Sequence, residues 1–184
     1  MSTEVAPAPR TLEEIDPAWL TWALSRSRPG VAVNGVTFGR SERATGTKIR
    51  MMLDYNEAGH RARLPPTMWF KGGYEAHSAH VRTSHARESL FYAEFGPLNL
   101  VNAPTCYFAG IDAQTSYGVQ LIEDLLQRNV WFGDARRPID AGLARRALAQ
   151  LAKLHAYHWN SENLSDLGPV GGSLATDGIV LRIM

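Results

Sequence analysis

The spacing of hydrophobic residues changes several times along the chain, and each change marks the boundary of a predicted element. Trp19, Leu20 and Leu24 recur at helical spacing, which predicts a short amphipathic helix over about 12–26. Residues 1–10 are rich in Pro and Ala and show no such period, so they are predicted to be disordered.

Five later segments have the pattern of β-strands. Between residues 47 and 55 the odd positions are mostly hydrophobic and the even positions mostly polar, which predicts a strand with one buried face. Residues 31–38 are predicted as its hairpin partner, across a polar connection at residues 39–46. The other predicted strands are residues 67–71, 105–111 and 117–123.

Two more helices are predicted after the third strand. Residues 83–95 form the first, which Pro97 ends. The second begins at Asp140, a favourable N-cap residue, and runs to about Trp159. Residues 161–184 carry no period and are predicted to be an irregular tail. The apolar stripe of the second helix consists of Leu143, Ala147, Leu151 and Leu154.

The order of these elements predicts an α+β fold. Strands three and four are separated by one inserted helix, and the remaining strands follow one another directly. This order favours a five-stranded antiparallel sheet over a repeating parallel βαβ fold.

Composition and charge exclude several classes of protein. Lys plus Arg is 19 and Asp plus Glu is 18, so a net charge of +1 gives no electrostatic reason to expect a nucleic-acid or membrane partner. The first residues lack a signal peptide, and no apolar run is long enough to span a bilayer. We therefore expect a cytoplasmic protein. The histidines lack the spacing of a metal site, so no metal-ligating residue is predicted.

Five landmarks follow one another along residues 12–159 in a fixed order. They are Ala44-Thr45-Gly46-Thr47-Lys48-Ile49-Arg50, Trp69-Phe70-Lys71-Gly72-Gly73, Glu88-Ser89-Leu90-Phe91-Tyr92, Leu121-Ile122-Glu123-Asp124-Leu125, and the segment from Leu151 to Trp159. In this order they resemble the amino-terminal lobe of the kinase-like phosphotransferases, a group that includes aminoglycoside, choline and ecdysteroid kinases. The resemblance implies a kinase-like N-lobe at 11–123, and a hinge with the first C-lobe helix at 124–160.

The resemblance gives two of these residues a role in holding nucleotide phosphates. Lys71 takes the place of the phosphate-binding lysine on strand three. Glu88, on the following helix, would pair with Lys71 and hold its ammonium in place, and Glu94 is the alternative partner.

The same resemblance lays the first hairpin over the nucleotide. Backbone amides of Thr45, Gly46 and Thr47 would then approach the phosphates closely. The sequence departs from the protein-kinase pattern, because no Gly-x-Gly-x-x-Gly is present and residues 40–43 add charge instead. An ordinary hairpin turn is the alternative for these residues.

Adenine is expected where the two lobes of such kinases join. The backbone groups of Glu123, Asp124 and Leu125 would read the base, and Leu121 and Ile122 would form part of an apolar slot. From the residues alone, this segment is also suited to end a strand and cap a helix, so that alternative stays open.

In this family a carboxyl-terminal lobe supplies a catalytic aspartate in a His-Gly-Asp-type loop and an aspartate that binds magnesium. Asp166 and Asp177 are the aspartates after Trp159, and neither follows a histidine. We therefore expect no catalytic residue and no metal ligand in these 184 residues. ATP and magnesium, with a small-molecule hydroxyl as phosphate acceptor, are expected for complete relatives.

Two alternatives to a phosphotransferase fragment remain. One is a non-catalytic module that binds nucleotide or regulates a partner, and the other is an unrelated α+β domain that matches the landmarks by chance. For a fragment, the apolar stripe of the helix at 140–159 would be exposed, and self-association through that helix is expected.

We expect the 184-residue chain to show no kinase turnover. Phosphoryl transfer needs charge neutralisation by a metal and a base for the acceptor hydroxyl, and neither has a candidate residue in the sequence. A coupled ADP-release assay with a panel of hydroxylated substrates measures this, and clear turnover by the pure chain would contradict the expectation.

Overall fold

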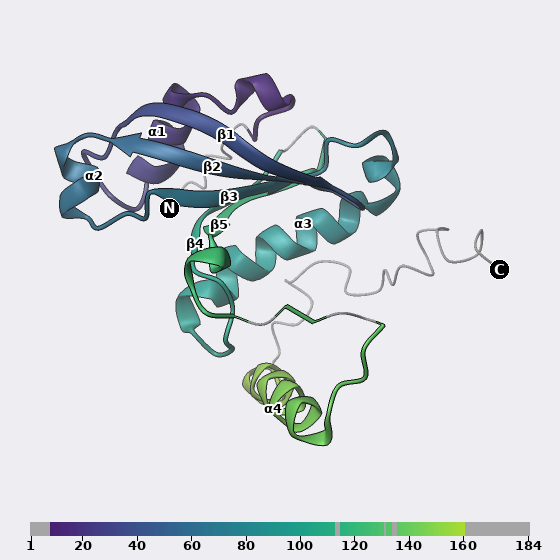
Figure 1. The fold of residues 1–184 in the computed structure, drawn as a ribbon. Helices are drawn as coiled ribbons and strands as arrows, with labels where there is room; N and C mark the ends of the chain where they lie inside the picture. The colour runs from purple at the N-terminus through teal and green to yellow at the C-terminus, as the bar shows by residue number, and fades with distance from the viewer. Residues whose placement is uncertain (1–7, 113–114, 131, 134–135, 161–184) are drawn as a thin grey trace.

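The computed structural model describes residues 8–112, 115–130, 132–133 and 136–160 (Figure 1). In this part of the chain the strands are β1 (Val33–Arg43), β2 (Thr47–Tyr55), β3 (Thr67–Gly72), β4 (Cys106–Ile111) and β5 (Gly118–Glu123). The α-helices are α1 (Pro17–Ser25), α2 (Glu57–Arg61), α3 (Arg82–Leu90) and α4 (Ala141–Tyr157). Shorter helical turns are Leu12–Glu14, Ala76–Val81, Phe91–Phe95, Gly96–Leu98 and Leu125–Gln127.

The strands form one open sheet in the order β1-β2-β3-β5-β4, and every neighbouring pair is antiparallel. The helix α1 lies against one face of this sheet and α3 lies against the other (Figure 1). The predicted α+β class with a five-stranded antiparallel sheet is therefore confirmed for the described residues.

Three of the helices begin at a polar side chain that caps the first turn. Asp16, Asn56 and Asp140 each accept a hydrogen bond from the backbone N–H three residues later, at 2.7, 3.0 and 2.7 Å. Each cap satisfies a donor that the first helical turn leaves without a partner. The predicted start of α4 at Asp140 is confirmed by this bond.

The face of the sheet toward α1 carries the hydrophobic core. The predicted alternation along β2 is confirmed, since its odd positions are buried and its even positions are mostly exposed. Met51, Phe70 and Leu121, on β2, β3 and β5, pack with Leu20 and Leu24 of α1, and all five are fully buried. Because a strand alternates its side chains, their neighbours must leave the sheet on the opposite face.

That opposite face is covered by α3 over part of its area only. Trp69 and Lys71 alternate with the buried residues of β3 and lie beside Arg50 and Lys48 of β2 in the ladder. Along β5, Gln120 is the ladder partner of Lys71. This face therefore brings polar and aromatic side chains of neighbouring strands together.

The first hairpin is longer than predicted. β1 continues to Arg43, so the loop expected at residues 39–46 shrinks to the turn 44–46. Glu42 pairs with Lys48 in the ladder, after a register shift between Phe38 and Ser41. The hydrophobic pattern missed this extension because both faces of the edge strand are solvated there, so its side chains do not alternate.

Two other elements differ from prediction. The short helix α2 was not predicted, and it separates β2 from β3, which were expected to follow one another directly. Residues 56–59 have the composition of a turn and no helical period. The Asn56 side chain caps them, however, and a short helix forms. The helix expected at residues 83–95 begins earlier, with Ala76–Val81, and its last turn, Phe91–Phe95, is a π-helix.

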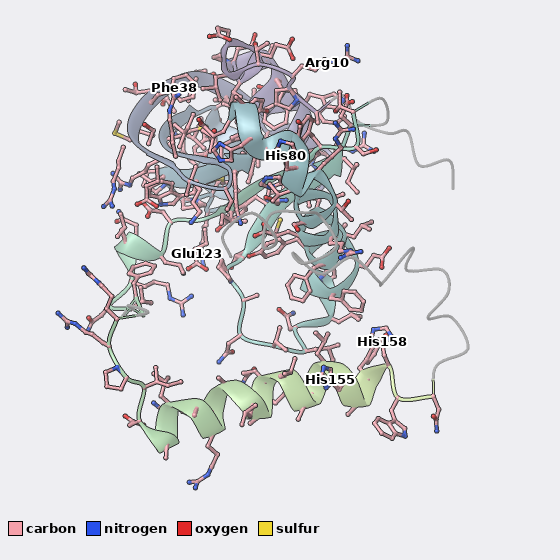
Figure 2. The ribbon with its side chains drawn as sticks, turned by 90° about the vertical axis from the view of Figure 1, so that its right-hand side faces the viewer. Arg10, Phe38, His80, Glu123, His155 and His158 are labelled. Carbon is pink, nitrogen blue, oxygen red and sulfur yellow. The ribbon has the colours of Figure 1, made fainter. Side chains whose placement is uncertain are left out.

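The helix α4 runs apart from the sheet (Figure 2). None of its residues is buried; Leu151 of the predicted apolar stripe is 46% exposed, and Leu148, outside that stripe, is 64% exposed. Its carboxyl end contacts the turn after α3. There the His158 ring packs edge-on against the Phe95 ring, with the ring centroids 4.9 Å apart. The side chain of Gln150 accepts a hydrogen bond from the backbone of Asn102 at 3.0 Å.

The ends of the predicted segments lie partly outside the described residues. Of the segment expected to be disordered, residues 8–10 pack against the sheet: Ala8 is 3% exposed, and the Pro9 carbonyl accepts the Tyr74 hydroxyl at 2.6 Å. Residues 1–7 and 161–184 are not described. Among the helices that are described, none is long and apolar enough to cross a membrane.

Replacing Leu20 by Ala should lower the free energy of unfolding by about 2–5 kcal/mol, because the side chain is fully buried between α1 and the sheet. Urea unfolding followed by circular dichroism measures the change. Leu148→Ala is the matched control, since that leucine is 64% exposed and its loss should change stability by about 0.5 kcal/mol or less. Equal effects of the two changes would contradict the described core.

Candidate functional site

A cavity of about 470 Å³ lies on the face of the sheet that α1 does not cover. Charged side chains come to it from the first hairpin, β3 and β5, and apolar side chains from β3, β5 and the segments before β4 and after β5. A cavity of this size with a few polar groups and apolar walls is typical of a small-molecule site. Its lining residues are Arg40, Glu42, Lys48, Trp69, Lys71, Pro104, Ile122, Glu123, Leu125, Leu126 and Phe132.

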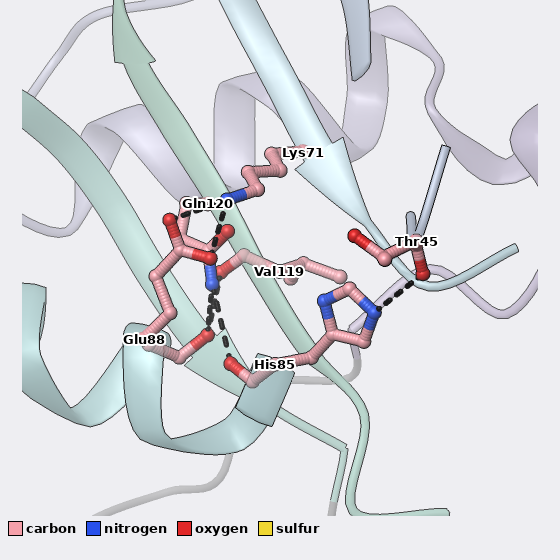
Figure 3. Close-up of polar contacts among 7 residues, drawn as sticks. Thr45, Lys71, His85, Glu88, Val119 and Gln120 are labelled. Atoms are coloured by element: carbon pink, nitrogen blue, oxygen red, sulfur yellow. Dashed lines mark hydrogen bonds and ion pairs between the residues drawn. The ribbon is translucent and has the colours of Figure 1, made fainter. Parts of the chain in front are cut away.

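An ion pair at this cavity links β3 to α3. The Lys71 ammonium donates to both carboxylate oxygens of Glu88 at 2.5 Å (Figure 3). The predicted partnership is confirmed, and Glu94, the alternative partner, is exposed. The side chains of the pair are 21% and 32% exposed, so water screens them less than it would screen a surface pair.

The position of Glu88 follows from how closely α3 approaches β5. A Cβ atom at Gly118 would lie 2.4 Å from the Ser89 hydroxyl and closer still to the His85 carbonyl, so only glycine permits this approach. His85 and Ser89 are buried one helical turn apart, which turns the Glu88 side chain toward the sheet beside them.

A buried amide fastens α3 to β5 next to the ion pair. Gln120 is 1% exposed, and its side-chain nitrogen donates to the Ser89 hydroxyl at 2.5 Å and to the His85 carbonyl at 3.5 Å (Figure 3). The Ser89 hydroxyl donates in turn to the Val119 carbonyl at 3.4 Å. These bonds explain how polar groups are accommodated in the contact between the helix and the strand.

The tip of the first hairpin is held down on the segment that leads into α3. The Thr45 carbonyl accepts hydrogen bonds from Ser78 and His85, both at 3.3 Å, and the Thr47 hydroxyl donates to Glu75 at 2.6 Å. Burial lowers the pKa of His85, and because a carbonyl can only accept, the bond to Thr45 requires a hydrogen on Nε2 of the ring.

Gly46 lies between these contacts. A Cβ atom there would be 2.6 Å from the His85 ring and 2.9 Å from the Gly72 carbonyl. Thr45, Gly46 and Thr47 therefore pack against the start of α3, and none of the three lines the cavity. The hairpin contributes to the cavity through the residues on its sides instead.

The segment after β5 is organised by Asp124, which is 2% exposed. Its carboxylate accepts hydrogen bonds from the Arg50 guanidinium at 2.7 Å, the Trp69 indole at 3.0 Å and the Leu126 N–H at 3.1 Å. Burial raises its pKa, but the hydrogen bonds to the carboxylate, the one from Arg50 foremost, together outweigh burial, so the pKa lies below its usual value. The carboxylate thus holds the Trp69 ring at the cavity wall.

The other predicted hinge residues divide between the cavity and the core. Glu123 and Leu125 line the cavity together with Ile122. Leu121 does not, because its side chain leaves β5 on the core face and is fully buried. The Glu123 carboxylate accepts from the Thr105 N–H at 3.1 Å; burial raises its pKa, but this bond and Arg128 lower it below the usual value overall.

Sequence reasoning missed a second lysine of the site. Lys48 and Lys71 are direct ladder partners on β2 and β3, and both line the cavity. Two like charges directly opposite each other disfavour the strand pairing. Lys48 makes no ion pair within the described ranges, whereas Lys71 is compensated by Glu88. The alternation of β2 places Lys48 on the polar face, but the ladder register was needed to bring it beside Lys71.

The residues described in the structure contain no group of three His, Cys, Asp or Glu side chains that could hold a metal ion. No protein-family model, curated protein or solved structure matches this chain. The function of the cavity must therefore be argued from its own residues.

Replacing Asp124 by Asn should lower the free energy of unfolding at pH 7 by about 1–3 kcal/mol, because a buried carboxylate that accepts several hydrogen bonds is lost. Its pKa is lowered in the folded state, so this stabilisation is present above about pH 4, the unfolded value, and is lost as the pH falls through the folded value. The measurement is urea unfolding of both proteins from pH 7 to pH 3.

Asp54→Asn is the matched control, because Asp54 is exposed on the same sheet. Its stability should match that of the unchanged protein across the whole pH range. If Asp124→Asn kept its full deficit at pH 3, or showed none at pH 7, the carboxylate would not have the role described.

Proposed function

We propose that this chain forms the nucleotide-binding lobe of an ATP-dependent phosphotransferase of the small-molecule kinase type. In the reaction of such an enzyme, a substrate hydroxyl oxygen bonds to the γ-phosphorus of ATP as the bond from that phosphorus to ADP breaks. The hydroxyl proton passes to a base. The observation that carries the proposal is the pairing of Lys71 with Glu88 at the charged end of a cavity whose other end is apolar.

The charged end fits a chain of phosphates. Lys71 is held by Glu88, so its ammonium can meet an anion without first losing the freedom of a long side chain. Lys48 lies directly across the ladder from Lys71 and makes no ion pair among the described residues, although Glu42, its ladder partner on β1, brings a carboxylate to the same cavity. An anion between the two lysines would replace their mutual repulsion with attraction to both.

The apolar end fits an aromatic base. The indole of Trp69, oriented by Asp124, forms one wall, and Ile122 and Leu125 line the same region. A flat ring that enters this space removes apolar surface from water and can stack on the indole. Trp69 and Lys71 are two residues apart on one strand face, which suits a ligand with a ring at one end and charge at the other.

The backbone groups that could form hydrogen bonds with the edge of the base are those of residues 124–125. The N–H of Glu123 already donates to the Thr105 carbonyl at 2.8 Å, and the N–H of Leu126 donates to the Asp124 carboxylate at 3.1 Å. The segment between these satisfied donors borders the cavity through Leu125. The carbonyls of Asp124 and Leu125 already accept from the N–H groups of Gln127 and Arg128 at 3.0 Å each, so the N–H groups of the two residues are the main-chain candidates for adenine.

The proposal gives these residues the work of binding and orienting the nucleotide. Lys71 and Lys48 would neutralise charge on the phosphates, which lowers the barrier to breaking the bond to ADP. Magnesium, when bound with ATP, would supply further positive charge at the phosphates. It is assigned no ligand from the described residues, because no suitable group of side chains is found among them.

Replacing Lys71 by Met should weaken ATP binding at least about tenfold, because one hydrogen-bonded charge contact to phosphate is lost. Isothermal titration calorimetry with ATP, tripolyphosphate and adenosine measures the change. The loss should appear with ATP and with tripolyphosphate but not with adenosine, because the lysine is assigned to the phosphates. Lys48→Met should weaken the same two ligands by a smaller factor, since its side chain is exposed.

Lys153→Met is the matched control, because it removes the same charge from α4, away from the cavity. It should bind all three ligands like the unchanged protein. Equal ATP affinity for the Lys71 and Lys153 variants, or a chain that binds neither ATP nor tripolyphosphate, would overturn the proposal.

A further inference from the structure

The side-chain oxygen of Gln120, beside the Lys71–Glu88 pair, accepts no hydrogen bond from the described residues. The residue is 1% exposed, and no described donor forms a hydrogen bond with its Oε1 atom. Buried amide oxygens almost always accept a hydrogen bond, because desolvation without one is unfavourable. A buried acceptor without a donor next to a proposed binding residue therefore needs an explanation.

The orientation of this amide is fixed by its neighbours. The side-chain nitrogen lies 3.5 Å from the His85 carbonyl and 2.5 Å from the Ser89 hydroxyl. A carbonyl can only accept, so the amide nitrogen, not the oxygen, must face His85. The two bonds occupy both hydrogens of the nitrogen and direct Oε1 away from α3.

Lys71 is the donor on that side. Lys71 and Gln120 are direct ladder partners on β3 and β5, so their side chains leave the sheet on the same face. Figure 3 shows the Gln120 amide in the space between the lysine and the α3 residues. An ammonium has three hydrogens, and the two oxygens of Glu88 take two of them, so one remains.

We infer that Gln120 is a positioning residue for Lys71. When a phosphate binds, the ammonium divides its hydrogens among one phosphate oxygen, one Glu88 oxygen and the Gln120 Oε1 atom. The tetrahedral nitrogen is then held from β5 as well as from α3, and its third hydrogen points into the cavity. This inference rests on the proposed function, because it assumes that Lys71 meets a phosphate.

The geometry explains why a glutamine suits this position. Its nitrogen fastens the strand to α3 while its oxygen serves the lysine, so one side chain sets the distance between the helix that carries Glu88 and the strand that carries Lys71. A leucine or methionine could fill the volume but could not accept from an ammonium. A second carboxylate could accept, but would add a buried negative charge that needs compensation.

The test compares two replacements that lose the same donor but differ in the acceptor. Gln120→Met removes both the nitrogen and the oxygen at nearly constant length, whereas Gln120→Glu removes the nitrogen and keeps an oxygen that can accept from Lys71. Calorimetric titration with tripolyphosphate measures the affinity of each. Gln120→Met should bind about tenfold more weakly than the unchanged chain, and Gln120→Glu should recover most of that loss.

Ser89→Ala is the control for the structural bond. It removes one partner of the Gln120 nitrogen and keeps the acceptor oxygen, so it should lower the melting temperature and weaken tripolyphosphate binding less than Gln120→Met does. If the Met and Glu replacements bind alike, the acceptor has no role and the inference is overturned. If the unchanged chain binds no tripolyphosphate, the proposed function fails as well, so the two failures are distinguishable.

A second measurement does not depend on the variants folding. In the unchanged chain labelled with ¹⁵N and ¹³C, an NMR correlation across the hydrogen bond from the Lys71 ammonium to the Gln120 side-chain carbonyl should appear when tripolyphosphate is added. Its absence from the saturated complex, where the Lys71 ammonium signal itself is visible, would overturn the inference.

Discussion

The ion pair between Lys71 and Glu88 joins the sheet to its inserted helix, and the candidate site depends on that junction. A pair that is partly exposed contributes little stability by itself, so it cannot be what holds α3 in place. The close approach at Gly118 and the buried bonds of Gln120 hold the helix against β5. The fold therefore positions the charges, and the charges fix the lysine for a ligand.

The two faces of the sheet separate stability from binding. On β3, Phe70 enters the core, while Trp69 and Lys71 on either side of it face the cavity. A one-residue slip of this strand would place the lysine in the core and the phenylalanine in the cavity. The buried alternation of β2 and β3 thus fixes the register on which the site depends, although no core residue touches the cavity.

Much of the fold follows from the sequence, because alternation and helical spacing depend on burial that each element determines locally. The pairing of Lys71 with Glu88 was predicted through a resemblance, and the structure brings these two residues together, whereas the strand order was not predicted. The arrangement at Asp124 could not be foreseen. Arg50 and Trp69 reach it from strands far away in the sequence, and their alternation gives the face but not the partner.

At the hairpin tip, the sequence suggested a contact with the ligand that the structure does not support. Thr45 and Gly46 have the composition of a flexible turn that could cradle phosphates, but contacts with His85 tie the tip to α3. Local sequence reports which conformations a turn can adopt, whereas long-range packing decides which surface it presents. The hairpin therefore borders the cavity with its charged sides, where the ladder register selects the residues.

That register leaves Lys48 directly opposite Lys71, an arrangement that disfavours the strand pairing when no anion is near. Glu88 pairs with Lys71, and Lys48 has Glu42 as its ladder partner on β1 but forms no ion pair among the described residues. A neutral residue in place of either lysine would remove this repulsion from the sheet. Retaining the repulsion makes sense if the strands meet an anion there, because binding then removes an unfavourable term as well as adding a favourable one.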